Sequence, residues 1–436
     1  MSFLRRSRIA LLVLLILTIY GFDAHARRRS LSTPATLGDQ SAYLGYARDL
    51  YESNYTVVGA RNRMPVFPFL LSFIYRPGLT ETEFLTRAQA FNVNLSIVLL
   101  LFLFLIFRKF VPPLWAVALL AATAFGVFLY RAINAQAEVL FYFVSFCAFV
   151  LLLQMLVAPR WWLAALGGTT MGLAHLTKAS VLPALALWIA VFLAQILWSL
   201  RNRHGGISAR AGRKIGMLLL VIATFMAVVF AYLRTSKRIY GQYFYNVNST
   251  FVMWCDSSTE AWEFLSAHGG KDQWRVLPPD QLPSLSKYWR EHSVAQIVQR
   301  LARGCHHLAT QNAMAIGYYK FVVAFVVAAA VLWARQSRRA RRLFGEKPFA
   351  AAFCVLFFGV YVLLYAWYDT IINDTRFVLS IFLPFVFAAS IFVLRLGKDR
   401  IISLAGRQLP FEQFFPGLLL GLAAIDALYN AARFAA

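Results

Sequence analysis

Residues 136–157 read QAEVLFYFVSFCAFVLLLQMLV, an almost continuous apolar run whose one charged residue, Glu138, lies near its start. A helix needs about 20 largely apolar residues to cross the hydrocarbon core of a bilayer. The run has that length, and its remaining polar residues are uncharged. It therefore predicts a membrane-spanning helix, and runs of the same kind recur along the chain.

Eleven such runs are present, and several are short enough to need polar flanks or a thinned bilayer. They cover residues 9–22, 92–107, 114–130, 136–157, 161–176, 181–199, 215–233, 317–334, 348–368, 376–394 and 414–432. A soluble domain has about 45–50% apolar and about 25% charged residues. This chain of 436 residues has 60% and 14%, with a mean hydropathy of +0.61. These values predict an all-α polytopic membrane protein, and they exclude a soluble enzyme, a disulfide scaffold and a disordered chain.

The formal net charge of +24 is distributed in a way that favours a membrane rather than nucleic acid as partner. The N-terminus and alternate short loops hold 21 of the 43 Lys and Arg residues but only three of the 19 acids. The other side holds 22 basic and 16 acidic residues, mostly in two long segments. Short basic loops are typical of the cytoplasmic face. We therefore expect a cytoplasmic N-terminus, a lipid bilayer as partner and no nucleic acid.

The first apolar run has two interpretations. Arg5, Arg6 and Arg8 precede it, and Ala24-His25-Ala26 after it resembles the cleavage site of a secretory signal peptide. Positive charge immediately after a cleavage site is unfavourable, however, and Arg27–Arg29 stand there. An uncleaved signal anchor is the favoured interpretation, and a cleaved signal peptide is the alternative.

Two segments on the predicted outer face are too long to be simple connections. The first, 23–91, belongs to an N-terminal transmembrane module over 1–233, and the second is 234–316. The C-terminal transmembrane helices then occupy 317–436. In the first outer loop, an apolar stripe with helical spacing begins after Asp39 and predicts a helix.

The rest of these outer segments also has helical patterns. In the first loop, Met64–Tyr75 is apolar but too short to span, which is typical of an interfacial helix. In the second segment, Ser257 and Glu260 have the spacing of a capping box, and an amphipathic pattern begins at Val294. We expect interfacial helices in the first loop and a small, mainly α-helical cap on the outer face from the second segment.

The four cysteines are too few for a disulfide framework. Cys147 and Cys354 lie in apolar runs, where a small core residue is the expected role. Cys255 and Cys305 lie in the second outer segment, and an oxidising compartment would allow them to pair. No spacing rule decides between a disulfide and two free thiols.

Asp39 is the sharpest candidate for chemistry. It stands in Gly38-Asp39-Gln40-Ser41, at the start of the helix predicted in the first outer loop. One interpretation is a helix N-cap, because Asp is among the best residues for satisfying free helical N–H groups. A carboxylate held at the membrane face can also act as general base on an acceptor hydroxyl. The two interpretations are compatible.

Several other charged residues share the predicted face of Asp39. Arg61 and Arg63 precede the interfacial stretch, and guanidinium groups recognise phosphate with paired hydrogen bonds. Charges at the ends of predicted spans usually face a cavity or a partner, although snorkelling towards water is the simpler alternative. These span-end residues are Arg131, Glu138, His175, Lys178, Asp374 and Arg376. Their common face favours a phosphate-binding site.

In their order and content, these pieces of sequence resemble the GT-C glycosyltransferases, especially the branch of protein O-mannosyltransferases and lipid A aminoarabinose transferases. The matching pieces are Gly38-Asp39-Gln40 with Tyr43 and Ala47, Arg63-Met64-Pro65-Val66-Phe67-Pro68, Ala137-Glu138-Val139-Leu140, Gly172-Leu173-Ala174-His175-Leu176-Thr177-Lys178, and Thr375-Arg376-Phe377 followed by Pro384. Each piece is short, and together they span most of the chain.

The resemblance implies a function and roles for individual residues. It implies an inverting transfer from a polyprenyl-phosphate-linked sugar donor to a lipid, glycan or protein acceptor, at the extracytoplasmic face of a bacterial inner membrane. Asp39 would deprotonate the acceptor. Candidates for binding the donor phosphate are Arg61, Arg63, Lys178 and Arg376. Candidates for positioning substrate are Tyr43, Glu138 and His175.

The sequence departs from the family next to the predicted base. Many members have a second acid directly after the first-loop acid, and here that residue is Gln40. We therefore assign no metal and no other cofactor, although a divalent metal is compatible with the family.

Two other classes of protein fit the same composition. A lipid or sugar transporter, or flippase, would use the intramembrane charges as a pathway, but transporters often show inverted repeats and midplane sites. Here no repeat is visible and the charges gather at one face. A structural subunit of an envelope assembly is the third possibility. The pattern favours the enzyme.

Overall fold

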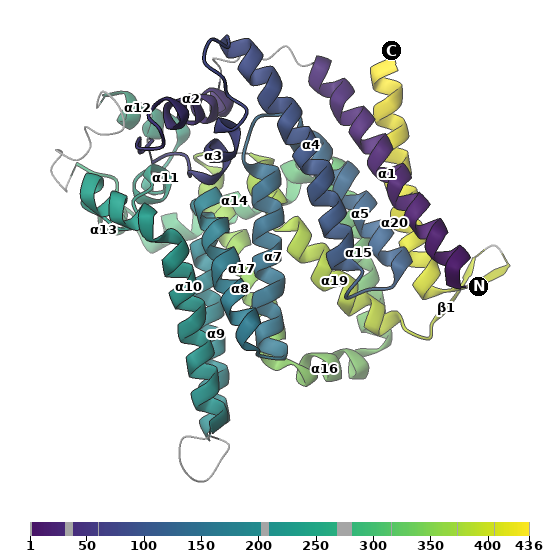
Figure 1. The fold of residues 1–436 in the computed structure, drawn as a ribbon. Helices are drawn as coiled ribbons and strands as arrows, with labels where there is room; N and C mark the ends of the chain where they lie inside the picture. The colour runs from purple at the N-terminus through teal and green to yellow at the C-terminus, as the bar shows by residue number, and fades with distance from the viewer. Residues whose placement is uncertain are drawn as a thin grey trace.

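A computed structural model describes residues 2–30, 38–59, 61–201, 209–267, 281–314, 316–372, 374–404 and 406–435. Within these ranges, nine helices are long and apolar enough to cross a membrane, judged by length and composition. They form one bundle, shown in Figure 1. The protein is therefore an all-α polytopic membrane protein, as its composition predicts.

All eleven predicted spans fall on helices. The long apolar helices are α1 (Ser2–Ser30), α4 (Glu81–Phe107), α5 (Pro113–Thr123), α7 (Glu138–Val157), α9 (Leu182–Arg201), α10 (Ala209–Tyr240), α15 (Ile316–Arg335), α17 (Pro348–Asp369) and α20 (Phe411–Ala435). Helix α5 continues through the π-helical turn η1 (Ala124–Phe128) into α6 (Leu129–Ala132). Helices α8 (Trp161–Thr177) and α19 (Phe382–Gly397) are shorter, with 17 and 16 residues.

The predicted span 376–394 is wrong as one continuous helix. The structure breaks it after Leu379 into α18 (Thr375–Leu379) and α19. Pro384 explains the break, because a proline has no N–H to bond the carbonyl four residues earlier, here that of Ser380. The side chain of Ser380 is instead held by Tyr365, with 2.5 Å between the two hydroxyl oxygens.

The first helix packs along one side of the bundle (Figure 1), and most of its side chains are exposed or half-buried. Helix α1 runs without interruption to Ser30 and lies against α4, where the hydroxyls of Tyr20 and Ser96 are 2.6 Å apart. It includes Arg27, whose side chain pairs with Asp23 at 2.9 Å. Retention of this segment as an uncleaved anchor stays a prediction.

The first outer loop contains two short helices, as predicted. Helix α2 (Gly38–Glu52) carries the apolar stripe that follows Asp39. Helix α3 (Val66–Ser72) occupies the middle of the predicted stretch Met64–Tyr75 and leaves Phe69 and Phe73 exposed. Both helices lie at one end of the bundle in Figure 1.

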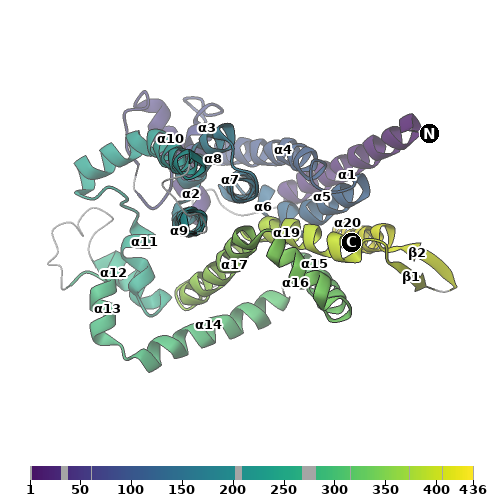
Figure 2. The same ribbon diagram turned by 90° about the horizontal axis from the view of Figure 1, so that it is seen from below.

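The second outer segment is mainly α-helical, again as predicted, although residues 268–280 lie outside the described ranges. Its elements are α11 (Val247–Thr250), η3 (Val252–Trp254), α12 (Ser258–Ala267), α13 (Leu285–Glu291), α14 (Val294–Met314) and the short connections between them. Ser257 caps α12 by accepting the N–H of Glu260 at 3.1 Å. The buried Arg300 of α14 fastens the cap to α17, because its guanidinium lies 4.2 Å from the Trp367 ring and donates to that residue's carbonyl. Figure 2 shows α14 along the edge of the bundle beside α17.

The four cysteines, all among the described residues, are free. Cys255 is buried and Cys305 is half-buried, and they do not pair. Cys147 and Cys354 lie in α7 and α17 as predicted, but both are only half-buried.

The opposite end of the bundle has two elements that the spans alone do not define. Helix α16 (Ser337–Glu346) lies across the helix ends in Figure 1. Strands β1 (Ile401–Leu404) and β2 (Arg407–Pro410) form an antiparallel hairpin with Ile401 opposite Pro410. This end is the face that the distribution of Lys and Arg predicts to be cytoplasmic, and α2 and α3 lie at the other face (Figure 1).

Candidate active site

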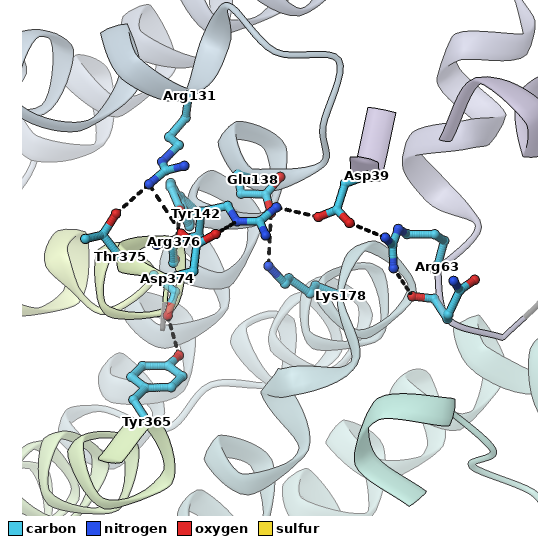
Figure 3. Close-up of polar contacts among 12 residues, drawn as sticks. Asp39, Arg63, Arg131, Glu138, Tyr142, Lys178, Tyr365, Asp374, Thr375 and Arg376 are labelled. Atoms are coloured by element: carbon cyan, nitrogen blue, oxygen red, sulfur yellow. Dashed lines mark hydrogen bonds and ion pairs between the residues drawn. The ribbon is translucent and has the colours of Figure 1, made fainter. Parts of the chain in front are cut away.

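Asp39 lies at the start of α2, where the backbone reaches the helix through Gly38. Gly38 has φ +73°, a left-handed conformation that glycine adopts without steric cost. The carboxylate of Asp39 accepts hydrogen bonds from two guanidiniums, that of Arg63 and that of Arg376, the latter at 2.5 Å. Arg63 comes from the α2–α3 loop and Arg376 from α18, so one carboxylate joins two elements far apart in sequence (Figure 3).

The N-terminal cap of α18 positions Arg376. Asp374 is the N-cap of α18, and its carboxylate accepts both the backbone N–H and the Nε–H of Arg376. Arg131 of α6 approaches the same carboxylate at 3.6 Å and donates to the Thr375 hydroxyl at 2.6 Å. These contacts hold Asp374 in place and fix the direction of the Arg376 guanidinium towards Asp39.

Glu138 and Lys178 complete the group. Glu138 is the first residue of α7, and its side chain is 3% exposed. Its Oε1 lies 3.1 Å from Nζ of Lys178 and 3.6 Å from Nη1 of Arg376. Its Oε2 is buried and has no hydrogen-bond partner among the described residues. That oxygen can accept a hydrogen bond from a bound molecule.

Close packing of α8 on α10 positions Lys178. A Cβ added to Gly168 or Gly172 would collide with Val221 or Val228 of α10, so these glycines let the two helices approach closely. Lys178 follows as the extended C-cap of α8. Its Nζ lies 5.2 Å from the centre of the Phe377 ring, which directs the ammonium towards α18.

We call these seven residues the Asp39 cluster: Asp39, Arg63, Arg131, Glu138, Lys178, Asp374 and Arg376 (Figure 3). Four cations face three carboxylates, which leaves one positive charge in excess. Of these seven side chains, that of Asp39 is the most exposed, at 32%, and that of Glu138 is the least exposed, at 3%. The excess charge and the open carboxylate suit the cluster to a small anionic group that enters beside Asp39.

The cluster also sets the ionisation of Asp39. Burial raises the pKa of this carboxyl, but the charges of Arg63, Arg376 and Lys178 outweigh burial and hold the pKa below its ordinary value. Asp39 is therefore a carboxylate at neutral pH, which is the form that a general base requires.

Three predicted site residues lie around the cluster rather than in it. The ring centre of Tyr43 lies 5.5 Å from the guanidinium of Arg63. Arg61 instead contacts α10, where it donates to Thr235 at 2.6 Å and lies 4.1 Å from the Tyr232 ring. His175 is 1% exposed and packs against the Tyr232 ring at 5.7 Å. The functional roles predicted for these three residues stay predictions.

Gln40, which stands where many GT-C enzymes have an acid, has a structural contact here. It is 4% exposed, and its side-chain oxygen accepts the N–H of Ala135 at 2.8 Å. It therefore ties α2 to the loop between α6 and α7, next to Glu138. Within the described residues, no group of three His, Cys, Asp or Glu side chains is arranged to hold a metal ion.

A small apolar cavity of about 20 Å³ lies near the cluster. Its lining comes from α7, α8, α9, α17 and the α18–α19 break. Phe141 and Ser380 line it, and the Phe141 ring lies 5.9 Å from Nζ of Lys178. A space of this size holds about one water molecule, so it is a packing gap and not a channel for a lipid chain.

Sequence reasoning missed one charged pair. Lys320 of α15 and Asp426 of α20 form an ion pair between two predicted spans. The signal was available, because opposite charges within two apolar runs usually face each other. The contacts of Arg131 with Asp374 and Thr375 join α6 to the start of α18, a pairing of distant residues that apolar periodicity does not reveal.

Comparisons with known proteins add little to this geometry. No family model matches the chain, and no curated protein matches it by sequence. The chain is similar to the crystal structure of ArnT from Cupriavidus metallidurans bound to undecaprenyl phosphate, with 16% identity over 84% of this chain and 78% of that chain. The TM-score is 0.35, a value too low to support a function. The assignment of function therefore depends on the residues of the Asp39 cluster.

Proposed function

We propose that the protein is a GT-C-like membrane glycosyltransferase that moves a sugar from a polyprenyl-phosphate donor to an acceptor hydroxyl. The observation that carries the proposal is the Asp39 cluster. A carboxylate is held there by two guanidiniums, and the cluster has one positive charge in excess. The order of sequence motifs, which resembles that of GT-C enzymes, supplies the class of donor.

The guanidiniums explain how the donor phosphate would bind. Arg63 and Arg376 each donate to one oxygen of Asp39, and these oxygens occupy positions that phosphate oxygens could take. Guanidinium groups bind phosphate with charge-assisted hydrogen bonds of the same kind. A lipid phosphate would therefore compete with Asp39 for Arg63 and Arg376, and Lys178 would add a third positive charge.

This competition links binding to catalysis. When a phosphate takes the guanidinium hydrogen bonds, the Asp39 carboxylate loses the contacts that stabilise its charge, and its pKa rises. Donor binding would thus convert a weak base into a stronger one beside the sugar. The stronger base is present only when the phosphate is in place.

The transfer itself needs one proton acceptor and stabilisation of one leaving group. The acceptor oxygen attacks the anomeric carbon from the side opposite the phosphate, and its proton passes to Asp39. The bond from the anomeric carbon to the phosphate oxygen breaks, and its electron pair leaves with the lipid phosphate. Arg376 and Lys178 stabilise the charge that develops there. The configuration at the anomeric carbon is inverted.

Other predicted residues have supporting roles in this scheme. The unpartnered Oε2 of Glu138 would accept a hydroxyl or amine hydrogen of the sugar. Tyr43 would hold Arg63 through its ring. Arg61 and His175 would shape the wall of the site on the α10 side, where both contact Tyr232.

The site would face the extracytoplasmic side of a bacterial inner membrane. The cluster lies at the end of the bundle opposite the basic helix α16 (Figure 1). Short loops rich in Lys and Arg favour the cytoplasm, which places Asp39 outside.

The test is sugar transfer in detergent by the purified protein, with undecaprenyl-phosphate-linked hexoses and aminopentoses as a donor panel. Asp39→Asn should lower transfer by about 10²- to 10⁴-fold, the usual contribution of a general base. Asp49→Asn is the matched control, because Asp49 lies exposed on the same helix. It should transfer at the rate of the unmodified protein. Near-normal turnover by Asp39→Asn would remove Asp39 from catalysis.

The same assay separates the enzyme from a transporter or flippase. Detergent removes the two compartments that transport requires, so a transporter would give no transferred sugar from any donor. Transfer in detergent supports the enzyme.

A further inference from the structure

An apolar groove runs along the outside of the bundle between α15 and α20, away from the Asp39 cluster. It has a volume of about 710 Å³ and is lined by apolar side chains of both helices, among them Val327, Val331, Phe415 and Leu418. The smaller side chains of Ala324 and Ala328 leave the space along α15. From Val323 to Arg335 the groove follows thirteen residues of helix, about 18 Å for twelve steps of 1.5 Å. One leaflet contributes about half of a hydrocarbon core about 30 Å thick, so the groove is long enough to cross one leaflet.

The two ends of the groove differ. At the end nearer the Asp39 face, Lys320 of α15 pairs with Asp426 of α20. The side chains are 22% and 9% exposed, so this pair holds the helices together there. At the other end the lining includes Arg335, the last residue of α15, and Arg400, which precedes β1. Both arginines are exposed, and neither forms an ion pair with a carboxylate of the described residues.

The hairpin beside Arg400 has the composition of a segment that lies among lipid headgroups. Ile401 and Leu404 are 63% and 54% exposed. Ile401 directly follows Arg400, and Leu404 is opposite Arg407 in the hairpin, so exposed apolar and basic side chains lie next to one another there. Exposed apolar side chains beside cations are typical of the membrane interface. Helix α16, which brings four more arginines, lies at the same end (Figure 1).

From these observations we infer that the groove between α15 and α20 is a binding site for an anionic phospholipid of the leaflet at the α16 face. One acyl chain lies in the groove, and the headgroup phosphate receives hydrogen bonds from Arg335 and Arg400. The occupant follows from charge and position. The groove opens to the membrane, its walls accept hydrocarbon, and its mouth offers two unpaired guanidiniums to an anion.

The inference goes beyond the proposed function and does not depend on it. None of the residues that line the groove belongs to the Asp39 cluster, so the lipid proposed here is distinct from the donor. Its role is to fill the weakly packed seam between α15 and α20 at the end where no ion pair joins these helices.

The test counts retained lipid by native mass spectrometry. Purified protein is exchanged into nanodiscs of phosphatidylcholine containing phosphatidylglycerol, then released into detergent. The unmodified protein should retain phosphatidylglycerol in preference to phosphatidylcholine. Arg335→Ala with Arg400→Ala should lower that preference by about tenfold or more, because two charge-assisted hydrogen bonds are lost. The control is Arg341→Ala with Arg342→Ala, which removes the same charge from α16 outside the groove and should leave the preference intact.

A second variant tests the groove itself. Ala328→Trp fills it without changing any charge, and it should also reduce retention of phosphatidylglycerol. Thermal unfolding of each variant in the same detergent establishes that it is folded.

Four results would overturn the inference. They are no preference in the unmodified protein, equal losses in the two arginine double variants, full retention in Ala328→Trp, and displacement of phosphatidylglycerol by undecaprenyl phosphate. Equal losses would mean diffuse attraction by surface charge, and displacement would mean a second donor site. None of these results bears on sugar transfer, so the proposed function stands or falls separately.

Discussion

Two of the groups of charges that lie between helices of this protein are built differently. The Asp39 cluster has four cations for three carboxylates, and the side chains of Asp39 and Lys178 are 32% and 23% exposed. The other group is a single pair, Lys320 with Asp426, in which one cation meets one carboxylate. The first group lies at one face of the bundle, and the second joins α15 to α20 within the apolar spans.

The difference distinguishes a binding site from a structural ion pair. The balanced pair carries no excess charge, so it can hold two helices together without a counter-ion from a ligand, although Oδ2 of Asp426 has no hydrogen-bond partner among the described residues. A cluster with surplus positive charge and an open carboxylate remains incomplete, because charge near hydrocarbon is costly unless it is matched. A lipid phosphate would supply the missing negative charge. Substitutions in the two groups should therefore have opposite patterns of effect on ligand binding and on stability.

The largest effect should come from Arg376, which contacts both Asp39 and Glu138. Arg376→Ala should weaken binding of undecaprenyl phosphate by about 10- to 100-fold, since a hydrogen bond to a charged group contributes about 1.5–3 kcal/mol. Arg376→Lys keeps the charge and should recover part of the affinity. Binding is measured by titration in detergent, with undecaprenol as the uncharged probe.

The matched control for Arg376 comes from the other group. Lys320→Met removes one cation from a helix interface without touching the cluster, and affinity for undecaprenyl phosphate should not change. Equal losses of affinity for undecaprenyl phosphate in Lys320→Met and Arg376→Ala would contradict the distinction between a binding site and a structural ion pair.

Stability should show the reverse pattern. Lys320→Met leaves Asp426 largely buried without its cation and should lower the free energy of unfolding by about 1–3 kcal/mol. The double variant Lys320→Met with Asp426→Leu removes both charges and should recover most of this loss. Thermal unfolding in detergent measures both variants. If the double variant loses as much stability as the single variants Lys320→Met and Asp426→Leu lose together, the two residues do not act as a pair.

A smaller effect should follow from removing the carboxylate that competes with the phosphate. Asp39→Asn frees hydrogen bonds of Arg63 and Arg376 and removes a negative charge, so undecaprenyl phosphate should bind a few times more tightly while transfer is lost. The comparison is with Asp49→Asn, which should bind as the unmodified protein does. Weaker binding by Asp39→Asn would mean that the carboxylate organises the site instead of competing for it.

The smallest effect should be that of pH on the free enzyme. The arginines hold the pKa of Asp39 below its ordinary value, so the carboxylate is ionised from about pH 5 upward, and kcat/KM should not titrate on Asp39 there. Bound phosphate raises the pKa, so kcat should begin to fall at a higher pH than kcat/KM as the solution is acidified. Rates between about pH 4 and pH 8 test this. A fall in kcat/KM near neutral pH that disappears in Asp39→Asn would contradict the description of the free site.

The spans and the common face of the site were predictable from the sequence because each depends on local composition. Apolar runs indicate helices. Short loops rich in Lys and Arg alternate with segments that hold most of the acids, and this alternation predicts that Asp39, Lys178 and Arg376 share one face before any contact is known. The structure brings these residues together with Arg63 and Glu138.

What the sequence did not predict depends on contacts between distant residues. Arg61 lies two positions from Arg63, yet it turns to Thr235 because an aromatic surface on α10 receives it. To predict the break between α18 and α19, one must notice that Pro384 cannot donate a backbone hydrogen bond, although it lies within an apolar run. The pairing of Lys320 with Asp426 joins residues 106 positions apart.

The most direct test of the central claim is an experimental structure of the protein with undecaprenyl phosphate. The phosphate should lie beside Asp39, within hydrogen-bonding distance of the guanidinium of Arg376, with Lys178 facing it. A phosphate bound elsewhere, with the contacts of Asp39 to Arg63 and Arg376 unchanged, would contradict the assignment of the Asp39 cluster as the active site.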